Sequence, residues 1–233
     1  MKKYFELIDC LLLSYLGGFL DGYSLLFRGN KFTCMQTGNI IYFAIDLVNK
    51  NYDSLLFPFY LFICFVVGLI FAYLFEFFLV KYKKEKLVHP LFLIVILLLL
   101  LPNFFYGKTN GIDDSLICPL LMSICGGILL ESFTKFKVKF TPTMMTNNTK
   151  LMVNSFLDSF LYKNKSYLYK GITYIFVIVF FVFGVASSAL LINFTALAQY
   201  TIFLAFIVII LLLVNELIIN KISINEINSN DSI

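Results

Sequence analysis

Two acidic residues, Asp21 and Glu131, stand inside long apolar stretches of the sequence. A carboxylate within a membrane is costly, and such groups usually face a cavity, a partner or an ion pathway. The two residues occupy nearly the same position in two related segments, which favours a shared role. We therefore expect Asp21 and Glu131 to couple protons or a cation. The alternative is that both lie near the end of a spanning helix and reach interfacial water.

Two polar segments carry hydrogen-bonding side chains at the start of helical stretches, in residues 33–49 and 141–162. If each segment begins a re-entrant half-helix, its N-terminus presents unsatisfied N–H groups and partial positive charge to a shared site. The alternative is a helix that lies flat at each membrane interface. The residues that we expect to bind a solute are Gln36, Thr37, Gly38, Asn39, Thr146, Asn147 and Asn148.

No constellation of residues indicates an enzyme. The chain lacks H-E-x-x-H, G-x-S-x-G and P-loop motifs, and His89 is its only histidine. His89 precedes Pro90 at a helix start, so we interpret it as a flanking residue. The five cysteines form no C-x-x-C pair, which argues against a zinc site or a disulfide framework. We predict no catalytic activity, no metal site and no cofactor.

The composition indicates a chain that is embedded in lipid. Of the 233 residues, 60% are hydrophobic and 14% are charged, whereas a soluble domain is nearer a quarter charged. The net charge of +4 comes from lysine clusters between apolar runs, which report membrane topology and not nucleic-acid binding. The bilayer is therefore the expected partner, and no nucleic acid is expected. The richness in Phe, Ile, Lys and Asn is typical of a protein from an AT-rich bacterial genome.

Six runs are long enough to span a bilayer, which takes about 20 apolar residues. If the N-terminus is cytoplasmic, 14 of the 18 basic residues face the cytoplasm, as the positive-inside rule requires. We therefore predict a multi-pass protein of the bacterial cytoplasmic membrane with both termini inside. The six runs are residues 7–27, 55–80, 87–106, 115–133, 171–194 and 198–220.

The sequence repeats itself at an offset of 109 residues. Between residues 17–42 and 126–151, 7 of 26 positions are identical, including a glycine pair and a Met-x-Thr-x-Asn motif. Because each copy holds three spans, the second copy enters the membrane from the opposite side. The predicted fold is thus all-α, with two inverted three-helix repeats that each carry a short re-entrant or interfacial helix. The repeats occupy residues 1–106 and 107–221, and a disordered tail follows at 222–233.

One stretch resembles the opening signature of the YoaK family, bacterial membrane proteins of unknown function. It reads Gly17-Gly18-Phe19-Leu20-Asp21-Gly22-Tyr23, followed by Phe32 and Gln36-Thr37-Gly38-Asn39. The likeness covers nearly the whole chain. The chain departs from the family pattern at Gly22, where alanine is usual, and at Asn147, where the second copy usually has glycine. The resemblance implies a six-span membrane protein and supplies no substrate.

Inverted repeats of this kind are characteristic of transporters and channels. The leading hypothesis is a secondary transporter or channel for a small polar or anionic solute, bound between the two polar segments. The alternative is a non-transporting membrane scaffold, an assembly partner or a lipid-interacting protein. Small-residue faces on the spans are also compatible with a homodimer.

Overall fold

The computed structural model describes residues 2–106, 116–133, 140–194 and 198–230, and all regular structure in these ranges is helical. This confirms the all-α prediction. The elements are α1 (Lys2–Phe27), α2 (Gln36–Val48), α3 (Tyr52–Lys81), η1 (Glu85–Leu87), α4 (Val88–Leu100), α5 (Pro102–Phe105), α6 (Ile117–Ser132), α7 (Met145–Tyr162), α8 (Lys165–Phe194), η2 (Ala198–Ile202) and α9 (Phe203–Asn230). Helix α9 continues through residues 222–230, where the sequence predicted a disordered tail.

Among the described residues, five helical segments are long and apolar enough to cross a membrane, and they coincide with five of the six predicted runs. The sixth run forms α6, which is apolar but only 16 residues long. At 1.5 Å per residue α6 is about 24 Å long, shorter than a hydrocarbon core of about 30 Å. A protein with several membrane-spanning helices is thus confirmed, while length alone does not establish a sixth crossing. The five segments are Tyr4–Phe27, Ser54–Lys81, Glu85–Phe105, Lys165–Phe194 and Ala198–Ile222.

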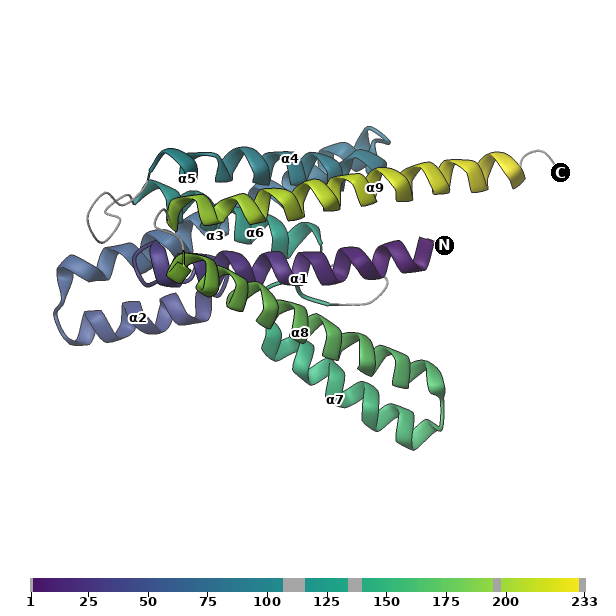
Figure 1. Cartoon of the computed structure of the whole chain (residues 1–233), viewed down its shortest axis with the longest axis horizontal. Coiled ribbons are helices and arrows are strands. Elements are labelled where there is room, and N and C mark those ends of the chain that lie inside the picture. The colour runs from purple at the N-terminus through teal and green to yellow at the C-terminus, as the bar shows by residue number, and fades with distance from the viewer. Residues whose placement is uncertain (1, 107–115, 134–139, 195–197, 231–233) are drawn as a thin grey trace.

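Helix α1 is the centre of the bundle. It packs along α8 and along α9, while α3 packs along α6 and α4 contacts both α6 and α9. Figure 1 shows α1 and α6 running in opposite directions, with the start of α1 and the end of α9 at the same end of the bundle. The apolar window of α1 is 72% buried, against 28% for α3 and 22% for α8. Helices α3 and α8 therefore turn apolar side chains outward, as lipid-facing helices do.

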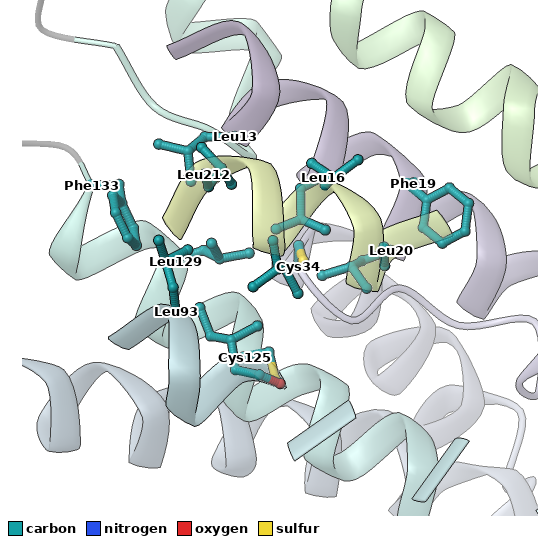
Figure 2. Packing of buried hydrophobic residues seen from close by; sticks show 14 of the residues in the cluster. Leu13, Leu16, Phe19, Leu20, Cys34, Leu93, Cys125, Leu129, Phe133 and Leu212 are labelled. Carbon is teal, nitrogen blue, oxygen red and sulfur yellow. The ribbon is translucent and has the colours of Figure 1, made fainter. Parts of the chain in front are cut away.

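The core lies where α1, α4, α6 and α9 meet (Figure 2). Leucine side chains from all four helices interdigitate there and are at most 1% exposed. Three buried cysteines, Cys10, Cys34 and Cys125, belong to the same cluster, where they pack as small hydrophobic side chains. The leucines are Leu13, Leu16 and Leu20 of α1, Leu93 of α4, Leu129 of α6 and Leu212 of α9.

Each of the two polar segments of the sequence forms a short helix that folds back on the long helix after it. Helix α2 packs on α3, and α7 packs on α8. The turns between the helices contain Lys50 and Lys163, whose φ angles of 54° and 50° place both in the left-handed region. Figure 1 shows the two hairpins pointing toward opposite ends of the bundle. The start of each short helix therefore lies deeper in the bundle than its end.

Glycines allow the long helices to touch through their backbones. A Cβ added to Gly184 of α8 would lie within 3.0 Å of the Tyr15 carbonyl oxygen of α1. A Cβ on Gly68 of α3 would meet the Ile124 carbonyl oxygen of α6 in the same way. Such approach is typical of small-residue contacts between membrane helices. The two contacts correspond at the repeat offsets, 109 residues from Tyr15 to Ile124 and 116 from Gly68 to Gly184.

Candidate functional site

Asp21 of α1 holds the turn that leads into α2. Its side chain is 3% exposed, and its Oδ1 accepts hydrogen bonds from the backbone N–H groups of Thr33 at 3.0 Å, Cys34 at 2.7 Å and Met35 at 3.4 Å. Its Oδ2 has no hydrogen-bond partner among the described residues. Burying a polar atom without a partner is costly. Asp21 therefore holds the turn with one carboxylate oxygen, while its other oxygen receives no hydrogen bond from the described residues.

Asn39 and Asn148 close equivalent turns in the two halves of the chain. The Asn39 amide accepts from the Phe32 N–H at 3.2 Å and donates to the Phe32 carbonyl at 2.6 Å. The Asn148 amide makes the same pair of bonds with Thr141, at 3.0 and 2.7 Å. Both side chains are fully buried. Their amides thus hold the two turns, and solute binding by these side chains stays a prediction.

A buried polar network ties the first turn to α6 and α3. Gln36 Nε2 donates to the Thr33 carbonyl at 2.9 Å and to Ser123 Oγ at 3.1 Å. Ser123 Oγ lies 2.7 Å from the Leu61 carbonyl and 3.1 Å from that of Thr33. A hydroxyl carries one proton, so the shorter contact to Leu61 is the stronger bond. The first turn, α6 and α3 are therefore joined by hydrogen bonds next to the start of α2.

The second turn packs on α1 as the first packs on α6. A Cβ on Gly17 would lie 2.8 Å from the Pro142 carbonyl oxygen, and one on Gly126 would lie 2.8 Å from that of Thr33. Thr143 in the second turn is 1% exposed, and its hydroxyl has no partner among the described residues. Each turn thus presents one buried polar group without a partner, Oδ2 of Asp21 beside the first and Oγ1 of Thr143 in the second.

The solute-binding set that the sequence predicted divides into two groups. Gln36, Asn39 and Asn148 are buried in the turns. Gly38 is half-buried against the Phe32 ring, while the remaining three residues, Thr37, Thr146 and Asn147, are exposed. Within the buried group, Gln36 bonds to the other half of the chain through Ser123, whereas Asn39 and Asn148 bond within their own turns. The exposed side chains lie on the outer surfaces of α2 and α7.

The structure does not bring the two predicted coupling residues together. Asp21 lies near the end of α1 and contacts the first turn. Glu131 is half-buried near the end of α6, and because α1 and α6 run in opposite directions (Figure 1), the two carboxylates lie toward opposite ends of the bundle. A coupling role for each residue stays a prediction, but the two do not share one site.

Arg28, the only arginine in the sequence, is 1% exposed. Its Nη2 donates to the Tyr23 hydroxyl at 3.1 Å and to the Asn103 carbonyl at 3.0 Å, and the guanidinium lies 4.7 Å from the Phe27 ring centre. Arg28 thus joins α1 to α5. A single arginine after an apolar run is the signal that could have identified it, because arginine suits buried pairing better than lysine.

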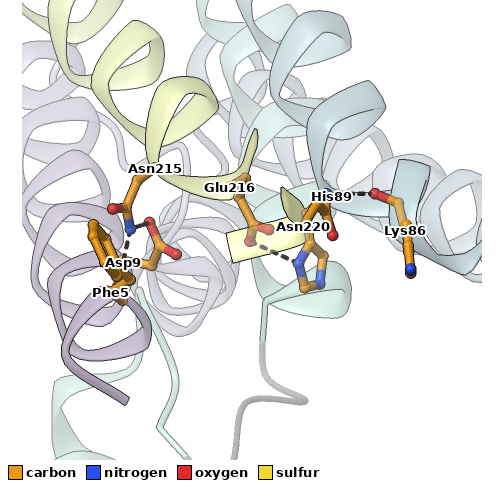
Figure 3. Close-up of polar contacts among 7 residues, drawn as sticks. All are labelled: Phe5, Asp9, Lys86, His89, Asn215, Glu216 and Asn220. Carbon is orange, nitrogen blue, oxygen red and sulfur yellow. Dashed lines mark hydrogen bonds and ion pairs between the residues drawn. The ribbon is translucent and has the colours of Figure 1, made fainter. Parts of the chain in front are cut away.

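A second buried polar cluster lies at the end of the bundle that holds both termini (Figures 1 and 3). Asp9 of α1 accepts from Asn215 of α9 at 2.7 Å. His89 of α4 bonds to Glu216 of α9 at 2.8 Å. No motif of the sequence indicated Asp9, Asn215 or Glu216, although each interrupts an apolar run. His89 does start a helix, as expected, but it also has a carboxylate partner.

Comparison with known proteins gives one match. The sequence model of a family described as "Protein of unknown function (DUF1275)" matches residues 10–214. This is the family that the Gly-Gly-x-Leu-Asp and Gln-Thr-Gly-Asn motifs indicated, so the resemblance is confirmed. No curated protein and no solved structure matches the chain. The function must therefore be argued from the residues of this chain.

Proposed function

We propose that this chain, which belongs to the DUF1275 family of proteins of unknown function, is a small-solute secondary transporter or channel of the bacterial cytoplasmic membrane. It crosses the membrane six times with both termini in the cytoplasm, and its halves form inverted repeats. The solute binds between the turns that precede α2 and α7. The observation that carries this proposal is the pair of buried turns, each packed on the first long helix of the other half.

The contacts between helices support the inverted repeat. Ser14 of α1 donates to the Val177 carbonyl of α8 at 2.7 Å, and Ser123 of α6 donates to the Leu61 carbonyl of α3 at 2.7 Å. The serines are 109 residues apart, and the carbonyls are 116 residues apart. The same offsets relate the glycine contacts and the two asparagine-closed turns. A repeat found in hydrogen bonds and in backbone packing is stronger support than sequence identity at 7 of 26 positions.

The chain path supports six crossings. Both termini lie at one end of the bundle (Figure 1), which requires an even number of crossings if that end lies on one side of the membrane. The five long segments therefore need a sixth, and α6 is the apolar helix that runs antiparallel to α1. The lysine cluster of residues 81–86 and the α7–α8 turn lie at the same end as the termini. The positive-inside rule assigns that end to the cytoplasm.

The chemistry of the turns suits a small polar solute. The starts of α2 and α7 supply N–H groups and partial positive charge at membrane depth. Asp21 supplies a buried carboxylate oxygen, and Thr143 supplies a buried hydroxyl, each without a partner in the described part of the chain. Irregular backbone at such depth is tolerated where it is enclosed by protein or lines a water-filled path. Asp21 is the residue that would exchange a proton or a cation during transport.

The second candidate is a non-transporting membrane scaffold. The observation that favours it is that the hydrogen-bonding groups of both asparagines are already paired. Both polar atoms of Asn39 and of Asn148 are bonded within their own turns. Glycine contacts also bring the helices into backbone contact around these turns. A scaffold would use the two turns only to pack its halves together, and it would bind no solute there.

Thermal unfolding of the purified protein with a panel of small metabolites and ions separates the two candidates. A ligand at a hundred times its dissociation constant adds about 2.7 kcal/mol of apparent stability. The stabilisation should vanish in Asp21→Asn and weaken in Thr143→Val. Thr201→Val is the matched control, because Thr201 is another buried threonine whose hydroxyl lacks a described partner, but it lies in η2. A ligand whose effect survives Asp21→Asn and Thr143→Val unchanged would contradict a site between the turns.

A further inference from the structure

Helix α1 carries a second buried carboxylate, Asp9, near the end of the helix away from the Asp21 turn. Asp9 and Asp21 are twelve residues apart, which corresponds to about 18 Å along the helix. Asp9 is 0% exposed. Its Oδ1 accepts from Asn215 Nδ2 at 2.7 Å, and its Oδ2 has no hydrogen-bond partner among the described residues.

Asn215 cannot satisfy the second oxygen. An amide NH2 has two protons, and Asn215 Nδ2 uses one toward Asp9 Oδ1 and the other toward the Phe5 carbonyl at 2.9 Å. Figure 3 shows one oxygen of the Asp9 carboxylate bonded to Asn215 and the other on the side of Glu216. An ionised Asp9 would therefore hold a charge on a buried oxygen that receives no hydrogen bond. A proton on Oδ2 removes that charge and makes the group a donor.

The charged and titratable groups around Asp9 come from four helices, and the charged ones are mostly acidic. Glu216 of α9, His89 of α4 and Glu6 of α1 interact electrostatically with Asp9, and the Cys10 thiol of α1 also lies nearby. On α8, Tyr174 faces Cys10. The carboxylates Asp9, Glu216 and Glu6 thus face one imidazole. Even with His89 protonated, the cluster has an excess of negative charge, which a buried site resists.

The cluster also has a route to water. The His89 side chain is 31% exposed and its Nδ1 lies 2.8 Å from Oε1 of Glu216, which is itself 6% exposed. Histidine is the side chain best suited to exchange protons near neutral pH. The His89–Glu216 pair therefore connects the aqueous end of α4 with the buried carboxylate pair of Glu216 and Asp9.

We propose that Asp9, Asn215, Glu216 and His89 form a proton-binding site between α1, α4 and α9, in which Asp9 Oδ2 accepts the proton. Asn215 orients the Asp9 carboxylate, and the protonated Oδ2 donates toward the Glu216 carboxylate. His89 exchanges the proton with water at the end of the bundle that holds the termini. Proton release leaves two buried carboxylates facing each other across α1 and α9, which weakens the packing of these helices. This site is separate from the two turns and requires no solute.

Infrared difference spectroscopy of the solute-free protein during a pH titration tests the proposal. A protonated carboxylic acid has a carbonyl-stretch band that a carboxylate lacks. We expect an acid band that persists at pH values where exposed carboxylates are ionised, and that shifts when aspartate is labelled with carbon-13. Asp9→Asn should remove this band. Asp21→Asn is the matched control, because it alters the other buried carboxylate of α1 and should leave the Asp9 band in place.

An unchanged acid band in folded Asp9→Asn would overturn the proposal, as would wild-type protein without an aspartate acid band. If Asp9→Asn does not fold, His89→Gln supplies the second test. It removes the only group of the cluster that can be a cation, so the pH at which the aspartate band disappears should change. A band that titrates identically in wild type and His89→Gln would contradict the role of His89. Because no solute is present, these results stand whether or not the chain transports one.

Discussion

Replacing Gly184 by alanine should weaken the contact between α8 and α1 more than any gain in helix propensity can offset. The added Cβ would meet the Tyr15 carbonyl, a backbone atom that cannot rotate away. Ordinary contact begins at 3.4 Å, so the two helices must separate by about 1 Å, a gap that forfeits a quarter to a half of the dispersion energy across it. Overpacking costs about 1–3 kcal/mol, and a contact with a backbone atom belongs at the upper end, about 3 kcal/mol. Alanine regains about 1 kcal/mol of helix propensity. We expect a net loss of about 2 kcal/mol.

Gly171→Ala is the matched control for Gly184→Ala, because it makes the same substitution in the same helix. There the new Cβ would meet ring atoms of Phe156, the nearest at 2.9 Å, and a side chain can adjust. The change in the free energy of unfolding of Gly171→Ala should stay within about 1 kcal/mol, because the gain in helix propensity offsets the cost of the close contact with Phe156. Reversible denaturant unfolding in detergent measures both variants. Equal losses for Gly184→Ala and Gly171→Ala would refute the reasoning, whereas Gly68→Ala should match Gly184→Ala if the repeats are equivalent.

Five further substitutions probe the turns, the hydrogen bonds between helices and the buried arginine. Asn39→Ala and Asn148→Ala should each cost about 1–3 kcal/mol of unfolding free energy, because each leaves buried backbone groups unsatisfied, and clearly unequal losses would argue against equivalent turns. In the same unfolding assay, Ser14→Ala should cost about 0.6 kcal/mol, typical of a hydrogen bond between membrane helices, and Ser123→Ala should cost more because its hydroxyl joins three elements. Arg28→Met should lower the thermal unfolding midpoint through the loss of two charged hydrogen bonds, worth about 1.5–3 kcal/mol each; an unchanged midpoint would contradict its role at the end of α1.

Much of the fold could be predicted from the sequence because lipid imposes a simple rule. A span needs a long apolar run, so five of the six predicted runs coincide with helices long enough to cross. The two polar segments do form helices, since their apolar residues recur at helical spacing. The structure also places glycines of both copies, Gly68 and Gly184, at close contacts between helices. The predicted run at residues 115–133 is the exception, because the helix it forms, α6, is only 16 residues long.

The candidate site was harder to predict because its bonds join residues that are distant in sequence. The Met-x-Thr-x-Asn motif identified Asn39 and Asn148, but the motif does not show that each amide would turn back to close its own turn. Nothing near Asp9 in sequence indicates that Asn215, 206 residues away, would be its partner. Arg28 directly follows a predicted span, and only the fold shows that Asn103 and Tyr23 contact it. Spacing identifies residues within one helix, and pairing between helices depends on tertiary packing.

The orientation of the two hairpin turns tests the inverted repeat most directly. Lys50 and Lys163 are exposed residues of left-handed conformation in the α2–α3 and α7–α8 turns. Lys50→Cys and Lys163→Cys variants would be reacted with a membrane-impermeant maleimide in intact cells and in inverted membrane vesicles, with the unsubstituted chain as background. The inverted repeat predicts that position 50 reacts only in intact cells and position 163 only in inverted vesicles. Reaction of both positions from the same side would contradict it and, with it, a solute site between the two turns.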